Sequence, residues 1–228
     1  MCRGLLRFSV GKKAAMALTG LVLLGFVIVH LAGNLLVFAG PEALNAYAAK
    51  LRHLGALLWA ARLVLAAAVV IHIWLSVVLS RENRAARPIG YARQQLARTT
   101  LGARTMMLSG ILLLVFLIYH LLHFTFRVTH PDISHLTDAL GRHDVYSMVV
   151  LSFQDPLLVA AYVVAMALLC LHLSHGIASW CQSLGLNNER TLPLTERAGR
   201  LMAWAIFLGY SSIPVSIYAG FVKPGGLY

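Results

Sequence analysis

Residues 14–38 read AAMALTGLVLLGFVIVHLAGNLLVF, a run of apolar and small side chains without a single charge. About 20 helical residues cross the ~30 Å hydrocarbon core of a bilayer, so this run predicts a membrane-spanning helix. His30 lies well inside it. An ionisable side chain at membrane depth is costly and marks a candidate functional residue. His30 is therefore the first candidate functional residue of the chain.

Four further stretches have the same character, and three of them also carry a buried histidine. The chain of 228 residues is 59% hydrophobic and 12% charged, whereas soluble proteins carry about 25% charged residues. We predict an all-α, integral membrane five-helix bundle that forms one domain over residues 1–228. The predicted spans are 14–38, 56–80, 104–127, 156–181 and 199–222. The other three histidines are His72, His120 and His172.

The charges predict the orientation of these spans. The net charge is +11, and with a cytoplasmic N-terminus 13 of the 19 basic residues fall on the inner side. They are Arg3, Arg7, Lys12, Lys13, Arg81, Arg84, Arg87, Arg93, Arg98, Arg104, Arg190, Arg197 and Arg200. The outer segments hold five of the eight acids. This bias predicts the N-terminus in the cytoplasm and the C-terminus outside. It explains the positive charge without a nucleic-acid partner.

The ends and connections of the spans carry weaker signals. The first apolar run is too long for the h-region of a signal peptide, so we expect it to be retained. Residues 41–54, which begin with Pro41 and Glu42, predict a short interfacial helix on the outer side. Residues 128–155 form a longer polar outer loop. Asp155 and Pro156 predict the start of the fourth span. We find no internal repeat.

The cysteines and acids exclude several classes of site. Cys2, Cys170 and Cys181 have no C-x-x-C spacing, so zinc, iron–sulfur and c-type haem sites are not expected. We interpret these thiols as packing residues. The spans contain no obvious carboxylate, which argues against a transporter built on buried Asp or Glu relays.

The depths of the four histidines sort them into two pairs. At 1.5 Å rise per residue, His30 lies ~26 Å and His120 ~24 Å from the inner ends of their spans. His72 lies ~14 Å and His172 ~18 Å from that surface, because their helices run the other way. An outer pair and an inner pair result, separated by ~10 Å along the membrane normal.

Two such pairs match the needs of two haems with two axial histidines each. Neutral imidazole is a good haem-iron ligand, and an apolar bundle receives the porphyrin. Two protein ligands leave no open position on the iron, so the implied chemistry is electron transfer. The alternative for each histidine is a structural hydrogen bond between helices. His123 and His175 follow three residues after His120 and His172, so each can replace its neighbour as ligand, hydrogen-bond a propionate or orient a ligand.

Several polar residues near the outer surface are further candidates. Arg62 either extends its guanidinium to the interface or pairs with a propionate of the outer haem. The histidines of the outer segments are expected to be solvated or to contact a propionate or quinone. They are His53, His130, His135 and His143.

A series of motifs over residues 9–186 resembles the diheme, five-span membrane cytochrome b subunit of succinate:quinone oxidoreductases, that is, of succinate dehydrogenase and fumarate reductase. These motifs include Met16-Ala17-Leu18-Thr19-Gly20, His30-Leu31-x-Gly33-Asn34, Pro41-Glu42-Ala43-Leu44-Asn45-Ala46-Tyr47, His72-Ile73-Trp74, Asn83-Arg84-Ala85-Ala86-Arg87-Pro88, Tyr119-His120-Leu121-Leu122-His123-Phe124-Thr125 and His172-Leu173-x-His175-Gly176. The fifth span carries no such motif.

The resemblance implies an assignment for each histidine pair. His30 and His120 would bind the iron of the distal b haem, and His72 and His172 that of the proximal one. Flavoprotein and iron–sulfur subunits would dock on the cytoplasmic face of the inner membrane. Electrons from succinate would pass to a membrane quinone, which we expect to be menaquinone, and succinate chemistry itself would not occur on this chain. Glu42, His53 and Arg62 are the candidate quinone residues near the distal haem.

Two other functions remain open at this stage. The chain can be the cytochrome b subunit of a membrane hydrogenase or formate dehydrogenase, which is also a redox function. A transporter or proton channel that uses buried histidines is an alternative of another class. Cytochrome bc complexes fit less well, because there two helices carry two histidines each.

Overall fold

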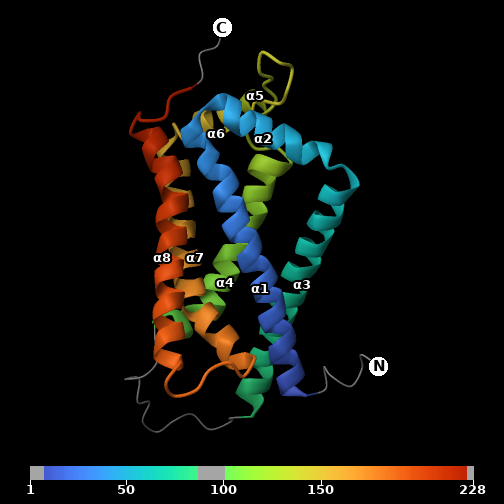
Figure 1. Ribbon diagram of the computed structural model, residues 1–228, viewed down its shortest axis with the longest axis vertical. Helices are drawn as coiled ribbons and strands as arrows, with labels where there is room; N and C mark the ends of the chain where they lie inside the picture. Colours follow the sequence, from blue (N-terminus) through green and yellow to red (C-terminus); the bar gives the residue numbers. More distant parts are fainter. Residues whose placement is uncertain (1–7, 87–100, 225–228) are drawn as a thin grey trace.

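The computed structural model describes residues 8–86 and 101–224, and within these ranges the secondary structure is helical, with no strand. Five helices are long and apolar enough to cross a membrane (Figure 1), which confirms the predicted all-α class with five spans. They are α1 (Ser9–Asn34), α3 (Ala56–Ala85), α4 (Leu101–His120), α7 (Pro156–Ser183) and α8 (Leu192–Tyr218).

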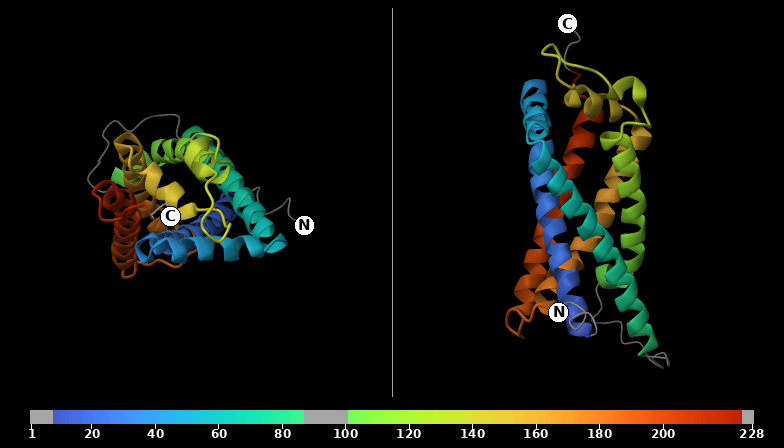
Figure 2. Two further views of the ribbon diagram at one scale, coloured as in Figure 1. Left: turned by 90° about the horizontal axis from the view of Figure 1, so that it is seen from above. Right: turned by 90° about the vertical axis from the view of Figure 1, so that its right-hand side faces the viewer.

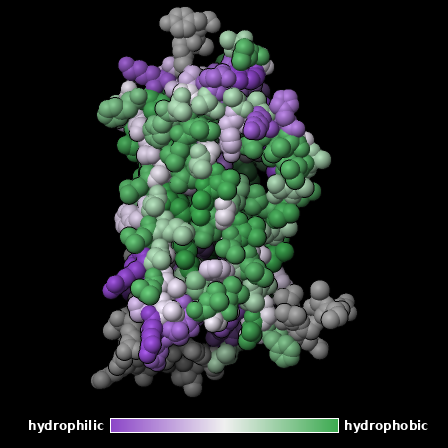
Figure 3. Space-filling view, viewed as in Figure 1, coloured by the Kyte–Doolittle hydropathy of each residue, from purple (hydrophilic) through white to green (hydrophobic). Residues whose placement is uncertain are grey.

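The surface agrees with a multi-pass membrane protein. Many large apolar side chains point outward, among them Trp59, Leu63 and Val115, each about 60% exposed or more. Figure 3 shows, on the face in view, an apolar band across the middle and polar groups toward both ends. In water these side chains would favour association. In a bilayer they face lipid.

Several helices extend beyond the predicted apolar runs. α1 begins at Ser9 and continues as a 3-10 turn (Leu35–Ala39), and α3 continues to Ala85. α8 begins at Leu192 and ends at Tyr218. The prediction followed hydropathy alone, whereas a helix can continue into the polar interface, where water and head groups solvate its side chains. α4 passes into a π-helical turn, Leu121–Thr125, which we call the π turn.

The end of the bundle that carries α2 (Pro41–His53) is closed by short elements, and we call it the α2 end. α5 (Pro131–Ser134) and α6 (Val145–Ser152) lie there beside α2 (Figures 1 and 2). α6 falls within the stretch predicted as a polar loop. Residues 145–152 are mostly apolar but too few to span a bilayer, and six of the eight are buried beneath the surface.

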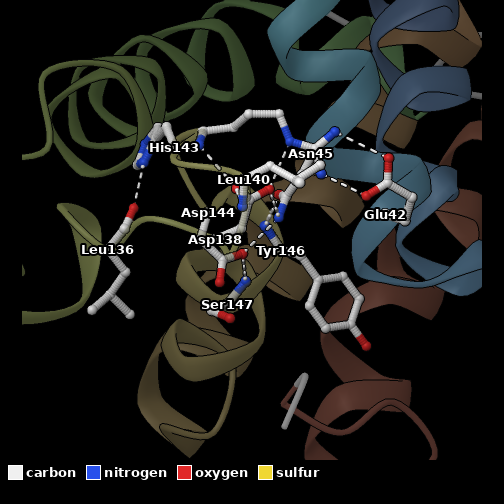
Figure 4. Close-up of polar contacts among 10 residues, drawn as sticks. Glu42, Asn45, Leu136, Asp138, Leu140, His143, Asp144, Tyr146 and Ser147 are labelled. Atoms are coloured by element: carbon white, nitrogen blue, oxygen red, sulfur yellow. Dashed lines mark hydrogen bonds and ion pairs between the residues drawn. The ribbon is translucent and has the colours of Figure 1, made fainter. Parts of the chain in front are cut away.

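Asn45 connects α2 with α6. Its side chain is 2% exposed, its Nδ2 donates to Asp144 Oδ1 at 2.9 Å, and its Oδ1 accepts from the backbone N–H of Tyr146 at 2.9 Å. Asp144 caps α6 by accepting from the backbone N–H of Ser147 (Figure 4). A buried polar side chain with satisfied partners fixes one arrangement of the elements around it. Burial alone would raise the pKa of Asp144. The hydrogen bonds from Ser147 and Asn45 outweigh this effect, so the pKa lies below its ordinary value.

An arginine connects α2 to the loop before α6. Arg142 donates to both oxygens of Glu42, at 3.0 and 2.5 Å, and to Asp138 Oδ2 at 2.7 Å. The hydrogen bond from Arg142 lowers the pKa of Glu42. Burial raises the pKa of Asp138, yet the hydrogen bonds from Arg142 and Leu140 bring it below its ordinary value. Both carboxylates are therefore charged at neutral pH.

The predicted start of the fourth span is confirmed. Asp155 is the N-cap of α7 and accepts from the backbone N–H of Leu157 at 2.8 Å, and Pro156 is the first helical residue. Proline suits this position because the first helical N–H has no partner within the helix. α7 then packs most extensively against α8.

The long helices fall into two closely packed groups. α3 packs on α1, whereas α4 and α8 both pack on α7. α1 also contacts α7 and thereby joins the groups. Among the described residues, α1 with α4 and α3 with α7 are not closely packed helix pairs.

The end opposite α2 holds the start of α1 and the end of α3 (Figure 1). Lys12 of α1 and Glu82 of α3 form an ion pair there. Five basic residues assigned to this side, and one thiol, lie outside the described residues. They are Arg3, Arg7, Arg87, Arg93, Arg98 and Cys2. Arg87 and Pro88 of the Asn83–Pro88 motif lie outside them as well.

Candidate functional site

The outer histidine pair comes from α1 and α4. The ring centroids of His30 and His120 are 6.0 Å apart, and their planes are nearly perpendicular at 85°. His30 also stacks on Phe26 at 5.1 Å and lies 6.2 Å from the ring of Tyr210. The pair sits toward the α2 end, because His30 is near the end of α1 and His120 is the last residue of α4.

The inner histidine pair comes from α3 and α7. The ring centroids of His72 and His172 are 6.5 Å apart, with an interplanar angle of 60°. The positions of His72 and His172 along the bundle follow from the glycines beside them, because His72 lies against Gly20 of α1 and His172 against Gly110 of α4. Each glycine precedes the outer histidine of its own helix by ten residues, so the two levels are about 15 Å apart along the helix axes. This separation exceeds the ~10 Å expected from counting residues to the inner surface.

Both ring separations fit a metal ion between the imidazoles. A bond from an imidazole nitrogen to a metal is about 2 Å, and the nitrogen lies about 1 Å from the ring centroid, so two axial rings have centroids about 6 Å apart. The helices that carry each pair do not pack closely on one another. Each pair is thus formed by two helices that meet at the rings without packing closely along their lengths.

Thr19 sets the tautomer of His72. Its hydroxyl oxygen lies 3.2 Å from His72 Nδ1, and its proton is directed to the Met16 and Ala15 carbonyls at 2.9 and 3.1 Å. Carbonyls can only accept, and a hydroxyl has one proton. We therefore assign Nδ1 of His72 as the donor to Thr19, which places the lone pair on Nε2.

Ser109 has the same relation to His172. Its hydroxyl donates to the Met106 carbonyl at 3.1 Å and lies 3.2 Å from His172 Nδ1. The same reasoning assigns the lone pair of His172 to Nε2. A metal-binding histidine usually donates its other ring N–H to an oxygen in this way, which orients the ring and raises its basicity.

Thr19 and Ser109 were not predicted, although a signal for both exists. Each is followed by glycine, and each precedes an outer histidine by eleven residues, as Thr19-Gly20…His30 and Ser109-Gly110…His120. The two copies share too few residues to stand out as an internal repeat in the sequence. In the structure, the hydroxyl of each copy contacts the ring of an inner histidine, and the glycine leaves room beside that ring.

Gly20 and Gly110 lie directly beside the inner rings. A Cβ at Gly20 would be 3.4 Å from His72 Cε1, and one at Gly110 would be 3.6 Å from His172 Cε1. A methyl group fits at these distances, but a larger side chain would fill the space beside the imidazole.

His123 and Tyr162 form a second group of rings next to His120. The phenol oxygen of Tyr162 lies 2.9 Å from His123 Nδ1 and 3.4 Å from His120 Nδ1. His123 Nε2 lies 3.1 Å from Ser152 Oγ, and the side chain of His123 is only 1% exposed. Both nitrogens of His123 thus have protein partners, and neither remains for a propionate. Tyr162 and Ser152 were not predicted, because they lie on α7 and α6, far from His120 in the sequence.

The remaining predicted cofactor residues have other surroundings. His175 is half-buried on α7, and its Cβ lies close to Gly102 of α4. Arg62 is exposed, with its guanidinium 5.0 Å from the ring centroid of Trp59. This stacking matches the interpretation in which Arg62 extends to the interface.

The predicted quinone residues lie at the α2 end. Glu42 is exposed and bound by Arg142. His53 is exposed and lines a cavity of about 230 Å³ together with Ala49, Arg52, Gly141, Arg142 and His143. Burial lowers the pKa of His143, and the nearby Arg52 and Arg127 lower it further. Among the described residues, no hydrogen bond, ion pair or ring contact joins Glu42, His53 or Arg62 to His30 or His120.

The remaining histidines contact other groups of the protein, and the two described thiols are buried. His143 contacts the Leu136 carbonyl and Arg127, His135 contacts the Pro131 carbonyl, and His130 lies 5.1 Å from the ring of His123. Cys170 and Cys181 are buried and free. In residues 8–86 and 101–224, no three His, Cys, Asp or Glu side chains gather as a metal cluster, whereas an axially bound haem needs only two.

Comparison with known proteins adds no identification: no family model, no curated protein and no solved structure matches this chain.

Proposed function

We propose that this chain is the diheme cytochrome b subunit that anchors a succinate:quinone oxidoreductase in the cytoplasmic membrane. The observation that carries the proposal is the placement of two histidine pairs, with ring centroids 6.0 and 6.5 Å apart, on helices that do not pack closely on each other. The motifs of residues 9–186 support the choice of this family among membrane cytochromes.

In this proposal four histidines are the iron ligands and two hydroxyl side chains orient two of them. His30 with His120, and His72 with His172, would hold the two haem irons, and Thr19 and Ser109 orient the rings of the inner pair. A haem held by two histidines would supply one-electron transfer.

The two levels give the electrons a direction across the bundle. The inner pair is closer to the end opposite α2, where Arg81, Arg84, Arg190, Arg197 and Arg200 form part of the basic face. We place the iron–sulfur and flavoprotein subunits on that face and the quinone, menaquinone by the family resemblance, near the α2 end. Haem bound at the two levels would supply electron transfer between those subunits and the quinone.

The first experiment is a difference spectrum of the purified protein, reduced with dithionite minus oxidised, with haem counted per chain. We expect b-type bands and two haems. A protein without haem contradicts the proposal and favours the histidine-containing transporter. Reduction of the haems in membranes by succinate, rather than by hydrogen or formate, separates the proposed function from the cytochrome subunits of hydrogenases and formate dehydrogenases.

The pairing is tested by two variants. His72→Ala and His120→Ala are each expected to retain one haem, and the two retained haems should differ in spectrum and potential. The double variant should retain none. Loss of the same haem from both single variants would show that the pairing is wrong.

A further inference from the structure

Tyr162 occupies a position between two histidines. Its phenol oxygen, on α7, lies 3.4 Å from His120 Nδ1 on α4 and 2.9 Å from His123 Nδ1 on the π turn. Its ring makes edge contacts with those of Phe116, His120 and Phe153. The phenol is therefore held by packing on several sides and by hydrogen bonds at its tip.

The proton positions in this chain of hydrogen bonds can be assigned by starting from Ser152, whose hydroxyl contacts His123. Ser152 Oγ donates to the Met148 carbonyl at 2.7 Å, so its oxygen must accept from His123 Nε2. His123 then carries its proton on Nε2 and a lone pair on Nδ1. That lone pair accepts the O–H of Tyr162, since the phenol is the only donor in this contact.

The proton of the His120 ring follows from the hydrogen bond of Tyr162. With its proton donated to His123, the phenol oxygen of Tyr162 can only accept from His120 Nδ1–H. The lone pair of His120 therefore lies on Nε2. The described residues provide no hydrogen-bond partner for this nitrogen. The same tautomer results at the inner level, where Thr19 and Ser109 are the acceptors.

We propose that Tyr162, held by His123 and Ser152, is a positioning residue that fixes the tautomer and basicity of His120 as a haem ligand. This inference rests on the proposed function, and it removes His123 from the candidate ligands. His123 acts on the outer iron only through Tyr162. An oxygen that accepts from the far nitrogen of an axial imidazole makes the ligand more basic and favours the oxidised iron.

The principal test is a redox titration of Tyr162→Phe, followed in the visible spectrum. Phenylalanine keeps the ring packing and removes the acceptor of His120 Nδ1–H. We expect the midpoint potential of the outer haem to rise while that of the inner haem stays unchanged. A role in packing alone would alter thermal stability and leave both potentials where they were.

Ser109→Ala is the matched control, because it removes the acceptor of His172 and should shift only the inner haem. Ser152→Ala is the second variant, and it remains informative if Tyr162→Phe does not fold. It frees His123 to take the other tautomer, so the outer haem should shift in the same direction by a smaller amount. Tyr162→Phe or Ser152→Ala with both haems bound and both potentials unchanged would overturn the inference.

A haem-free readout separates this inference from the proposed function. Nitrogen-15 spectra of histidine-labelled protein report which ring nitrogen carries the proton. We expect an Nε2–H signal for His123 that is lost in Ser152→Ala. An Nδ1–H signal for His123 would contradict the proton assignment whether or not the chain binds haem. A wild-type protein without any haem would instead refute the proposed function.

Discussion

Gly20 and Gly110 leave open space on one side of the inner imidazoles. Replacing Gly20 by leucine would place four carbons beside His72 Cε1, where a Cβ alone already reaches 3.4 Å. We expect Gly20→Leu to lose the inner haem and to keep the outer one. A pyridine haemochrome assay against protein concentration measures the change from two haems to one.

The matched control for this change is Gly25→Leu on the same helix. A Cβ at Gly25 meets no atom within 4 Å, so this variant should keep both haems. Gly20→Ala should keep both as well, because a methyl group remains in ordinary contact. Loss of haem from Gly25→Leu to the same extent would show that the effect comes from helix α1 in general rather than from the space beside His72.

The histidines could be predicted from the sequence, but their partners could not. A histidine within an apolar run is visible because its burial is costly wherever the helix lies. Thr19, Ser109, Tyr162 and Ser152 are ordinary residues whose roles arise only when another helix brings a ring nitrogen to them. Which of His120 and His123 faces His30 also depends on the π turn, and its geometry has no clear sequence signal.

At the scale of elements, the contact of α4 with α7 depends on Gly102. A Cβ at this position would lie 2.9 Å from the backbone oxygen of Leu171 and 3.2 Å from Cβ of His175. Neither atom can move without α7, so Gly102→Ala should force the helices apart. We expect a loss of about 1–3 kcal/mol in the free energy of unfolding, measured by denaturation in mixed micelles.

Gly176→Ala is the control for this substitution, since a Cβ at Gly176 meets nothing within 4 Å. Alanine is the better helix former by about 1 kcal/mol, so this variant should be as stable as the wild type or more so. Equal stability of Gly102→Ala and the wild type would mean that α4 and α7 tolerate a wider separation than their contact indicates.

The attachment of α2 to the loop before α6 should depend on pH. Glu42 and Asp138 have pKa values below their ordinary 4.5 and 3.8, with the hydrogen bond from Arg142 the main lowering cause for both. A lowered carboxyl pKa stabilises the folded state above the ordinary value, and this contribution is lost as the pH falls through the lowered one. The protection factors of the amides of residues 136–144, taken relative to their intrinsic exchange rates, should therefore fall below pH 3.8.

Arg142→Gln removes the cation that both carboxylates share. In this variant the protection factors at 136–144 should already be low at neutral pH and should change less on acidification. Arg62→Gln is the control, because Arg62 stacks on Trp59 and forms no ion pair in the described part of the chain. Identical pH profiles for Arg142→Gln and the wild type would show that other contacts hold the loop.

The long elements were predictable because the length of an apolar run and the thickness of a bilayer fix them together. The start at Asp155 and Pro156 was predictable from local chemistry. α6 was not, since eight mostly apolar residues within a polar loop fit neither a span nor a loop. Their burial depends on α2 and Asn45, which are distant in sequence.

At the scale of the whole molecule, the orientation in the membrane can be tested with single cysteines. Leu140, at the α2 end, is 70% exposed, and Leu186, between α7 and α8 at the opposite end, is 60% exposed. We expect a membrane-impermeant maleimide to label Leu140→Cys in intact cells and Leu186→Cys only in inverted vesicles. Both variants carry Cys2→Ser, and the buried Cys170 and Cys181 should stay unlabelled. The reverse pattern would invert the predicted topology.

The two closely packed groups of helices have corresponding parts. The hydroxyl–glycine pair and the outer histidine are spaced alike on α1 and α4, and each inner histidine comes sixteen residues after the first residue of its helix, α3 or α7. The bundle thus contains two copies of one arrangement: a helix with a hydroxyl–glycine pair and an outer histidine, and a helix with an inner histidine. α8 has no counterpart and packs on α7.

The distance between the two histidine levels has an electrical consequence. An electron that moves about 15 Å through hydrocarbon crosses about half of its ~30 Å thickness. A full crossing is worth about 2.3 kcal/mol per 100 mV, so this step would gain or lose about 1.2 kcal/mol per 100 mV of membrane potential. The ratio of reduced inner to reduced outer haem would then report the voltage across the membrane, and the energised state of the cell would help decide whether quinone is reduced or oxidised.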